Sequence, residues 1–71
     1  MLAMTREELQ QSLDAVAARM SGMRALYANN DELLRALAFE LDRIEEGAST
    51  PADADYVSRR IDRLLSEAHL L

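Results

Sequence analysis

The chain contains no cysteine, no tryptophan and no lysine, and it has only two glycines, one proline and three aromatic residues. Without cysteine, neither a disulfide bridge nor a thiolate metal cluster can stabilise the fold. With two isolated glycines, the glycine-rich loop that binds phosphate groups is excluded as well. Three aromatic side chains are also few for a self-sufficient core.

The size of the chain limits what it can do. At 71 residues it makes at most one small domain. A chain of this size buries only about 60% of the surface that its unfolded form exposes, so its stability is marginal. Hydrophobic residues make up 49% of it, too many for a disordered segment. It has little room for a buried pocket of about 300 Å³ or more, which disfavours most enzymes. These figures predict a core that is completed by a second chain.

The charge balance is acidic. Eight arginines oppose thirteen aspartates and glutamates, for a net charge of −5. Nonspecific nucleic-acid binding and binding to anionic membranes both depend on basic side chains, so both are disfavoured. Arginine in place of lysine, together with twelve alanines and twelve leucines, is the pattern that GC-rich codons produce. We therefore predict a bacterial, phage or plasmid origin.

No segment of the chain looks like a membrane span or a leader. No stretch approaches the roughly 18 apolar residues that a membrane span needs. The first residues lack the basic start and the long apolar run of a signal peptide. The protein is therefore predicted to be cytoplasmic, with either Met1 or Met4 as its start.

The first predicted helix has the clearest pattern. Thr5 and Glu8 have the spacing of a capping box, in which each side chain satisfies a backbone donor of the first turn. The helix is expected over about residues 6–28, a length of roughly 35 Å. Its apolar residues recur at intervals of four and three, the a/d spacing of a heptad repeat: Leu9, Leu13, Val16, Met20, Met23 and Tyr27.

The second helix is predicted over about residues 31–46. Asn29 and Asn30 suit both the end of one helix and the N-cap of the next. Gly47 is a natural stop, because glycine adopts a positive φ without steric cost. The apolar stripe of this helix is Leu34, Leu37, Leu41 and Ile44, with Leu33 beside it.

The third helix is predicted over about residues 51–69. Thr50 is its N-cap, and Pro51 occupies the first helical position, where its missing N–H costs nothing. Both connections are short enough to make successive helices antiparallel. The predicted fold is one all-α, three-helix domain over residues 1–71, and the stripe of its third helix is Ala54, Val57, Ile61, Leu64 and Ala68.

The stripe of the first helix has two interpretations: it packs on the other two helices, or part of it pairs with a second chain. We favour the second, because helix 2 spans only about 24 Å and would leave a third of helix 1 uncovered. A homodimer with two-fold symmetry is the simplest such assembly, and its helices can run parallel or antiparallel. The predicted dimer interface is Leu9, Leu13, Val16, Met20, Met23 and Tyr27.

A second stripe on the first helix consists of small residues, which are Ala15, Ala18, Gly22 and Ala25. A glycine inside a helix lowers helix stability by roughly 1 kcal/mol relative to alanine. Gly22 therefore either has a structural role or occupies a position where this cost is tolerated. Close approach of another helix is one interpretation. Solvent-facing alanines in an alanine-rich protein are the other.

Phe39 is the most informative single residue, because it points away from the apolar stripe of its helix and toward charged neighbours. Exposed aromatic residues and arginines dominate protein-interaction hot spots. Packing on the Arg35 stem or burial in the dimer are the alternatives. Tyr56 and Arg60 share a face of the third helix, where interleaved acids disfavour DNA reading. The predicted partner-binding residues are Phe39, Arg35, Arg43, Tyr56 and Arg60.

No pattern in the chain indicates catalysis. His69 is the only imidazole, and its place near the end of a helix is explained by the negative end of the helix dipole. Consecutive acids such as Glu45 and Glu46 diverge around a helix and do not converge on a metal. We predict that the chain has no enzymatic activity, cofactor or metal site.

The favoured function is that of a small regulatory adaptor or inhibitor that binds another protein. Its acidic surface suits a basic partner, such as the DNA-binding domain of a transcription regulator, whose phosphate-binding surface acidic helices can occupy. A subunit of a larger helical complex is the alternative. A DNA-associated regulator is less favoured.

Overall fold

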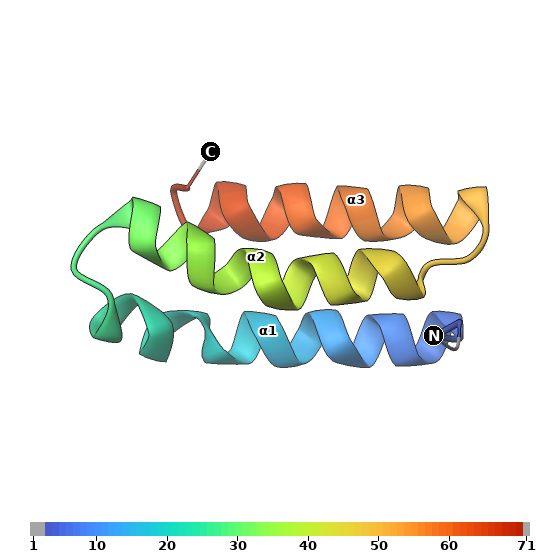
Figure 1. The fold of residues 1–71 in the computed structure, drawn as a ribbon, viewed down its shortest axis with the longest axis horizontal. Coiled ribbons are helices and arrows are strands. Elements are labelled where there is room, and N and C mark those ends of the chain that lie inside the picture. Colours follow the sequence, from blue (N-terminus) through green and yellow to red (C-terminus); the bar gives the residue numbers. More distant parts are fainter. Residues whose placement is uncertain (1–2, 71) are drawn as a thin grey trace.

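The computed structural model describes residues 3–70, so Met1, one of the two candidate start residues, lies outside it. Three helices run along the described chain: α1 (Arg6–Leu26), α2 (Asn30–Gly47) and α3 (Pro51–Glu67). They run up, down and up beside one another, which places the N and C ends at opposite ends of the bundle (Figure 1). The predicted all-α, three-helix architecture is confirmed.

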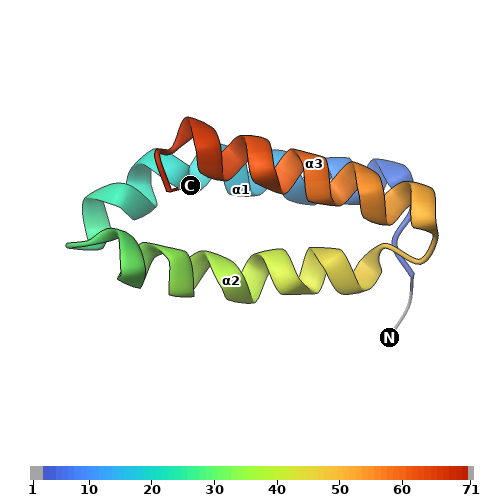
Figure 2. The same ribbon diagram turned by 90° about the horizontal axis from the view of Figure 1, so that it is seen from above.

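The three helices form a triangular bundle. Every pair of helices is in contact. Figure 2 shows α2 on one side and α1 together with α3 on the other. The bundle measures 35 × 20 × 18 Å, so its long dimension is close to the length of a single helix.

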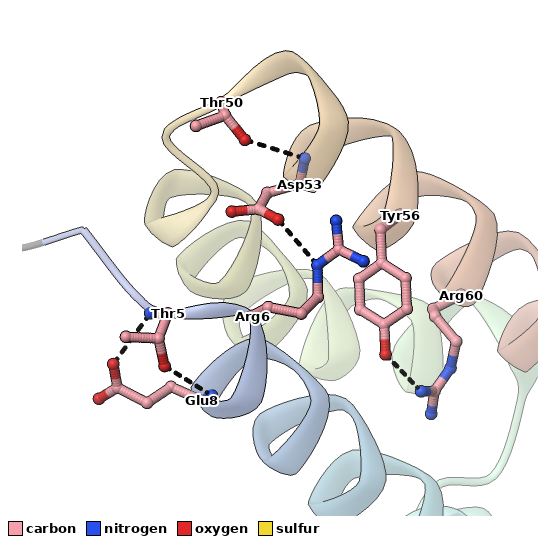
Figure 3. Close-up of polar contacts among 7 residues, drawn as sticks. All are labelled: Thr5, Arg6, Glu8, Thr50, Asp53, Tyr56 and Arg60. Atoms are coloured by element: carbon pink, nitrogen blue, oxygen red, sulfur yellow. Dashed lines mark hydrogen bonds and ion pairs between the residues drawn. The ribbon is translucent and has the colours of Figure 1, made fainter.

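Each helix begins at the predicted cap. The Thr5 hydroxyl accepts a hydrogen bond from the Glu8 backbone N–H at 3.1 Å, and the Glu8 carboxylate accepts one from the Thr5 N–H at 2.9 Å (Figure 3). The Asn29 side chain accepts from the N–H of Glu32 at 2.9 Å at the start of α2. Thr50 does the same at α3, and Pro51 is the first residue of that helix. These local pairs satisfy donors that have no partner within the helix.

The ends of the helices differ from the prediction by one or two residues. α1 stops at Leu26, because Tyr27 adopts an extended conformation that leads directly to the Asn29 cap. α2 includes Gly47, and no glycine of the described chain has a positive φ, so the predicted left-handed stop at Gly47 is wrong. The left-handed residue is instead His69, with φ 59°, which follows α3.

The end of α3 is a Schellman motif centred on His69. The His69 N–H donates to the carbonyl of Ser66 at 3.1 Å, and the Leu70 N–H donates to the carbonyl of Leu65 at 2.8 Å. This 5→2 and 6→1 pattern satisfies carbonyls that the helix leaves free. It also brings Leu70 back to the bundle, where Leu65 and Leu70 pack against the core.

The core runs along the axis of the triangle and uses side chains from all three helices. The predicted stripes supply most of it, with Leu33 buried in place of the half-buried Leu34. Ala54 is exposed, contrary to its predicted place in the stripe of α3. The buried apolar residues are Leu9, Leu13, Val16, Leu33, Leu37, Leu41, Ile44, Val57, Ile61 and Leu64. Within residues 3–70, no helix is long and apolar enough to cross a bilayer.

Candidate functional site

The apolar stripe of α1 lies mainly inside the bundle. Leu9, Leu13 and Val16 have at most 2% of their surface exposed, and they pack in the same cluster as residues of α2 and α3. Met20 and Met23 are half-buried against that cluster, and Tyr27 is exposed. In this fold the first three side chains therefore have no surface left for a second chain. The homodimer itself stays a prediction.

The helix lengths explain why α1 can be covered by its own chain. α1 has 21 residues and α2 has 18, so the two differ by only about 5 Å in length. The sequence pattern overestimated α1 at its end and underestimated α2 at both ends. The difference in length therefore does not by itself leave a third of helix 1 uncovered. The last turns of α1 are nevertheless only partly covered, since Met20 and Met23 are half-buried and Leu26 is exposed.

Phe39 lies on the outward side of α2, with 78% of its surface exposed. Arg35 and Arg43, one turn before and one turn after it, are exposed as well. Residues four apart on a helix are neighbours on its surface, so the two guanidinium groups flank the ring along the helix. We call this set the α2 outer face: Glu32, Arg35, Phe39, Asp42, Arg43 and Glu46.

α2 carries most of the net charge of the protein. It has six acids and two arginines, a balance of −4 out of the −5 of the whole chain. Of those acids, only Glu40 takes part in an ion pair of the described residues, with Arg19 of α1. Its last turn contains Glu45 and Glu46 and no basic residue. Acids there meet the negative end of the helix dipole, so this arrangement opposes helix stability.

Tyr56 and Arg60, the other two predicted partner-binding residues, are occupied within the chain. The Arg60 guanidinium donates to the Tyr56 hydroxyl at 3.0 Å and to the Asp14 carboxylate of α1 at 2.8 Å. On the other side, the Arg6 guanidinium lies 4.3 Å from the centre of the Tyr56 ring and pairs with Asp53 at 2.8 Å. Figure 3 shows the tyrosine between the two arginines.

This cluster joins α1 to α3 at two points. The hydrogen bond to Asp14 raises the pKa of Arg60, and burial opposes it only in part, so the group stays charged. The structure therefore divides the five predicted residues. It brings Arg35, Phe39 and Arg43 together on α2, and it places Tyr56 and Arg60 in a separate contact between α1 and α3.

A groove between α1 and α2 is a feature that the sequence analysis did not predict. It has a volume of about 480 Å³. Its α1 wall is made of small side chains with Arg19 at one end, and its α2 wall ends at Gly47. No signal in one helix predicts it, because it depends on which turns of α1 and α2 lie opposite each other. The lining residues are Met4, Ser12, Ala15, Val16, Arg19, Glu40, Arg43, Ile44 and Gly47.

The described part of the chain brings no three histidine, aspartate or glutamate side chains close enough together to hold a metal ion. The absence of enzymatic activity stays a prediction. Comparison with known protein families, with curated proteins and with solved structures finds no match to this chain.

Proposed function

We propose that this chain is a protein-interaction module, a small regulatory adaptor or inhibitor that binds a basic surface of another protein through the α2 outer face. The observation that carries the proposal is Phe39, a large apolar ring with 78% of its surface in solvent. Burying a phenylalanine side chain contributes about 1.5–3 kcal/mol. In the free protein the ring is exposed, so this free energy is not gained on folding. It is gained when a partner covers the ring.

The charge around Phe39 selects the kind of partner. The acids of α2 outnumber its arginines by four, and most of them have no ion-pair partner in the described chain. A surface of this sign attracts a basic partner over distances of about 10 Å and raises the rate of encounter. The two arginines beside Phe39 add forked donors, which are frequent in interface hot spots.

The position of the acids also gives the interface a direction. Glu45 and Glu46 stand at the C-terminal end of α2, where the free carbonyl groups add to their negative charge. Asp31 and Glu32 stand at the other end, where the helix dipole partly compensates them. The most basic part of the partner is therefore expected near residues 45 and 46. A DNA-binding domain has such a surface where it contacts phosphate groups.

The experiment has two stages. The chain is first used to capture a protein from a lysate of its source, and the affinity of the purified partner is then measured for variants. Phe39→Ala is expected to weaken binding by at least tenfold, as truncation of an interface hot spot does. A captured protein that binds Phe39→Ala as tightly as the original chain contradicts the proposal.

Two charge variants test the direction of the interface. Glu45→Gln with Glu46→Gln and Asp31→Asn with Glu32→Gln each remove two negative charges from the same helix. We expect the first pair to weaken partner binding more than the second. Equal effects at both ends would mean that only the net charge matters, with no preferred orientation of the partner.

A homodimer remains the second candidate, and the observation that favours it is an exposed apolar end of α1. Leu26 has 80% of its surface exposed, and Tyr27 beside it has 36%. A second chain that covers them would also meet the outward alanines of α1, all of which are exposed. Sedimentation at micromolar concentration tests this: a dimer has twice the 8.0 kDa of one chain, and Leu26→Glu should return it to a monomer.

A further inference from the structure

The groove between α1 and α2 differs from the rest of the protein in its charge. Its floor is apolar, made by Ala15, Val16 and Ile44. The charged residues that line it are Arg19, Glu40 and Arg43, a local balance of +1 in a chain of net charge −5. An apolar groove with a positive rim suits a ligand with an apolar body and an anionic end.

The two arginines of the rim differ in their ion pairing. Arg19 reaches across from α1 and is paired with Glu40 of α2, so this ion pair lies between the two walls of the groove. Arg43 takes part in none of the ion pairs of residues 3–70. A carboxylate that enters the groove thus finds one guanidinium without an anionic partner, and a second that is held by the half-buried carboxylate of Glu40 and can exchange it.

The opposite end of the groove is closed by the N-terminal segment. The Met4 N–H donates to the carbonyl of Gly47 at 2.9 Å, and its side chain lies over that glycine. The thioether provides an apolar surface there that adapts to different shapes. The walls run over residues 12–19 and 40–47, about two helical turns or roughly 11 Å. The space is therefore short, with Arg19 and Glu40 at one end and Met4 at the other.

We propose that this groove binds a single-chain carboxylate amphiphile, such as a free fatty acid of medium length. The carboxylate lies at Arg43 and displaces Glu40 from Arg19, while the alkyl chain lies over Ala15 and Ile44 toward Met4. No covalent bond changes, since the ligand carboxylate exchanges for the Glu40 carboxylate on one guanidinium. A cationic amphiphile should bind less tightly, because it would meet two guanidinium groups and only one carboxylate.

The experiment is a titration of the 71-residue chain with octanoate, kept below its micelle concentration and followed by amide chemical shifts. We expect saturable shifts confined to residues 12–19, 40–47 and Met4. Arg43→Gln should lower the affinity about five- to tenfold, because it removes a charge-assisted hydrogen bond. Glu40→Gln should raise it about two- to fivefold, because it frees Arg19 and removes a like charge.

Matched controls separate the groove from general effects. Arg63→Gln removes an exposed arginine of α3 that does not line the groove, and it should leave octanoate affinity unchanged. Ala15→Phe should fill the groove and abolish binding. Ala38→Phe, the same change at an exposed position of α2 outside the groove, should leave binding intact.

Several results would overturn the assignment. If octylamine bound as tightly as octanoate, the charge of the rim would have no role in binding. Shifts spread over all three helices without saturation would indicate detergent action. Groove shifts that appear on raising the protein concentration alone would show a second copy in the groove. Arg43 belongs to both the groove and the α2 outer face, but Phe39 does not line the groove. Octanoate binding should therefore survive Phe39→Ala, and this variant lets the two proposals fail independently.

Discussion

Met4 occupies the space that a side chain at residue 47 would need. A Cβ built on Gly47 would overlap the Sδ and Cγ atoms of Met4, whose N–H donates to the Gly47 carbonyl at 2.9 Å. Gly47 is buried and helical, so its value lies in the missing side chain and not in its backbone freedom. This contact attaches the segment before α1 to the end of α2.

Gly47→Ala is therefore expected to lower the free energy of unfolding by about 1 kcal/mol, in spite of the better helix propensity of alanine. Gly22→Ala is the matched control. A Cβ at Gly22 meets nothing within 4 Å, so this change should raise stability by about 0.5–1 kcal/mol. Urea unfolding followed by circular dichroism measures both. In a Met4→Ala background the cost of Gly47→Ala should largely disappear, and an unchanged cost would show that Met4 is not its cause.

Phe39→Ala should leave the free energy of unfolding within about 0.5 kcal/mol of its original value, because the ring is 78% exposed. Leu37→Ala, two residues away on the same helix, should cost about 2–5 kcal/mol, because Leu37 is fully buried. Thermal unfolding compares the two. A large loss of stability for Phe39→Ala would mean that the ring is covered in solution, as in a dimer.

Tyr56 lies at the contact between α1 and α3. Two variants measure separately what its hydroxyl group and its ring contribute to stability. Tyr56→Phe removes only the oxygen that accepts the hydrogen bond from Arg60, so it should cost about 0.5–1 kcal/mol. Tyr56→Ala also removes the ring under Arg6 and should cost about 1–2 kcal/mol more. Equal losses for both variants in urea unfolding would contradict the packing of Arg6 on the ring.

This α1–α3 contact should respond to salt but not to ordinary changes of pH. The pKa of Arg60 is raised in the folded protein, so its contribution is present below the unfolded value and is lost only as the pH rises above it. The unfolded value of arginine is already above the usable range. Between about pH 6 and 9, the cost of Tyr56→Phe should therefore be constant.

His69 has a φ of 59°, in the left-handed region, which glycine adopts without strain and most other residues adopt only with some strain. His69→Gly is expected to raise the free energy of unfolding by about 0.5–1 kcal/mol, because glycine relieves that strain. His69→Val should lower it, since a β-branched residue is disfavoured at positive φ. Thermal unfolding of the two variants tests this, and a loss of stability in His69→Gly would show that the imidazole itself makes a stabilising contact.

The local features of this fold are predictable from sequence because each depends on residues close together in the chain. The Thr5–Glu8 capping box joins residues three positions apart, and the helical stripes repeat every three or four positions. The stripe itself does not indicate which helices, or which chain, will cover it. Leu9 and Leu13 are equally apolar whether their own chain or a second one covers them, and only the packing of α2 and α3 decides between the two.

The same reasoning applies to the candidate sites. The exposure of Phe39 follows from its angle on one helix, so the helical wheel predicts it correctly. The packing of Arg6 on the Tyr56 ring and the ion pair between Arg60 and Asp14 each join residues about 50 positions apart. The Met4–Gly47 contact and the groove between α1 and α2 likewise depend on the register of two helices. No periodicity within a single helix encodes that register.

The unpaired acids at the end of α2 couple the stability of the free chain to its binding. Glu45 and Glu46 both lie at the negative end of the helix dipole, with no basic residue in their turn. Dissolved salt screens the resulting repulsion and so stabilises the end of α2, whereas it weakens attraction to a basic partner. A rise in ionic strength therefore reduces the cost of Glu45 and Glu46 to the free fold and lowers the affinity for a basic partner. A basic partner that covers these acids therefore offsets a repulsion that destabilises the free chain.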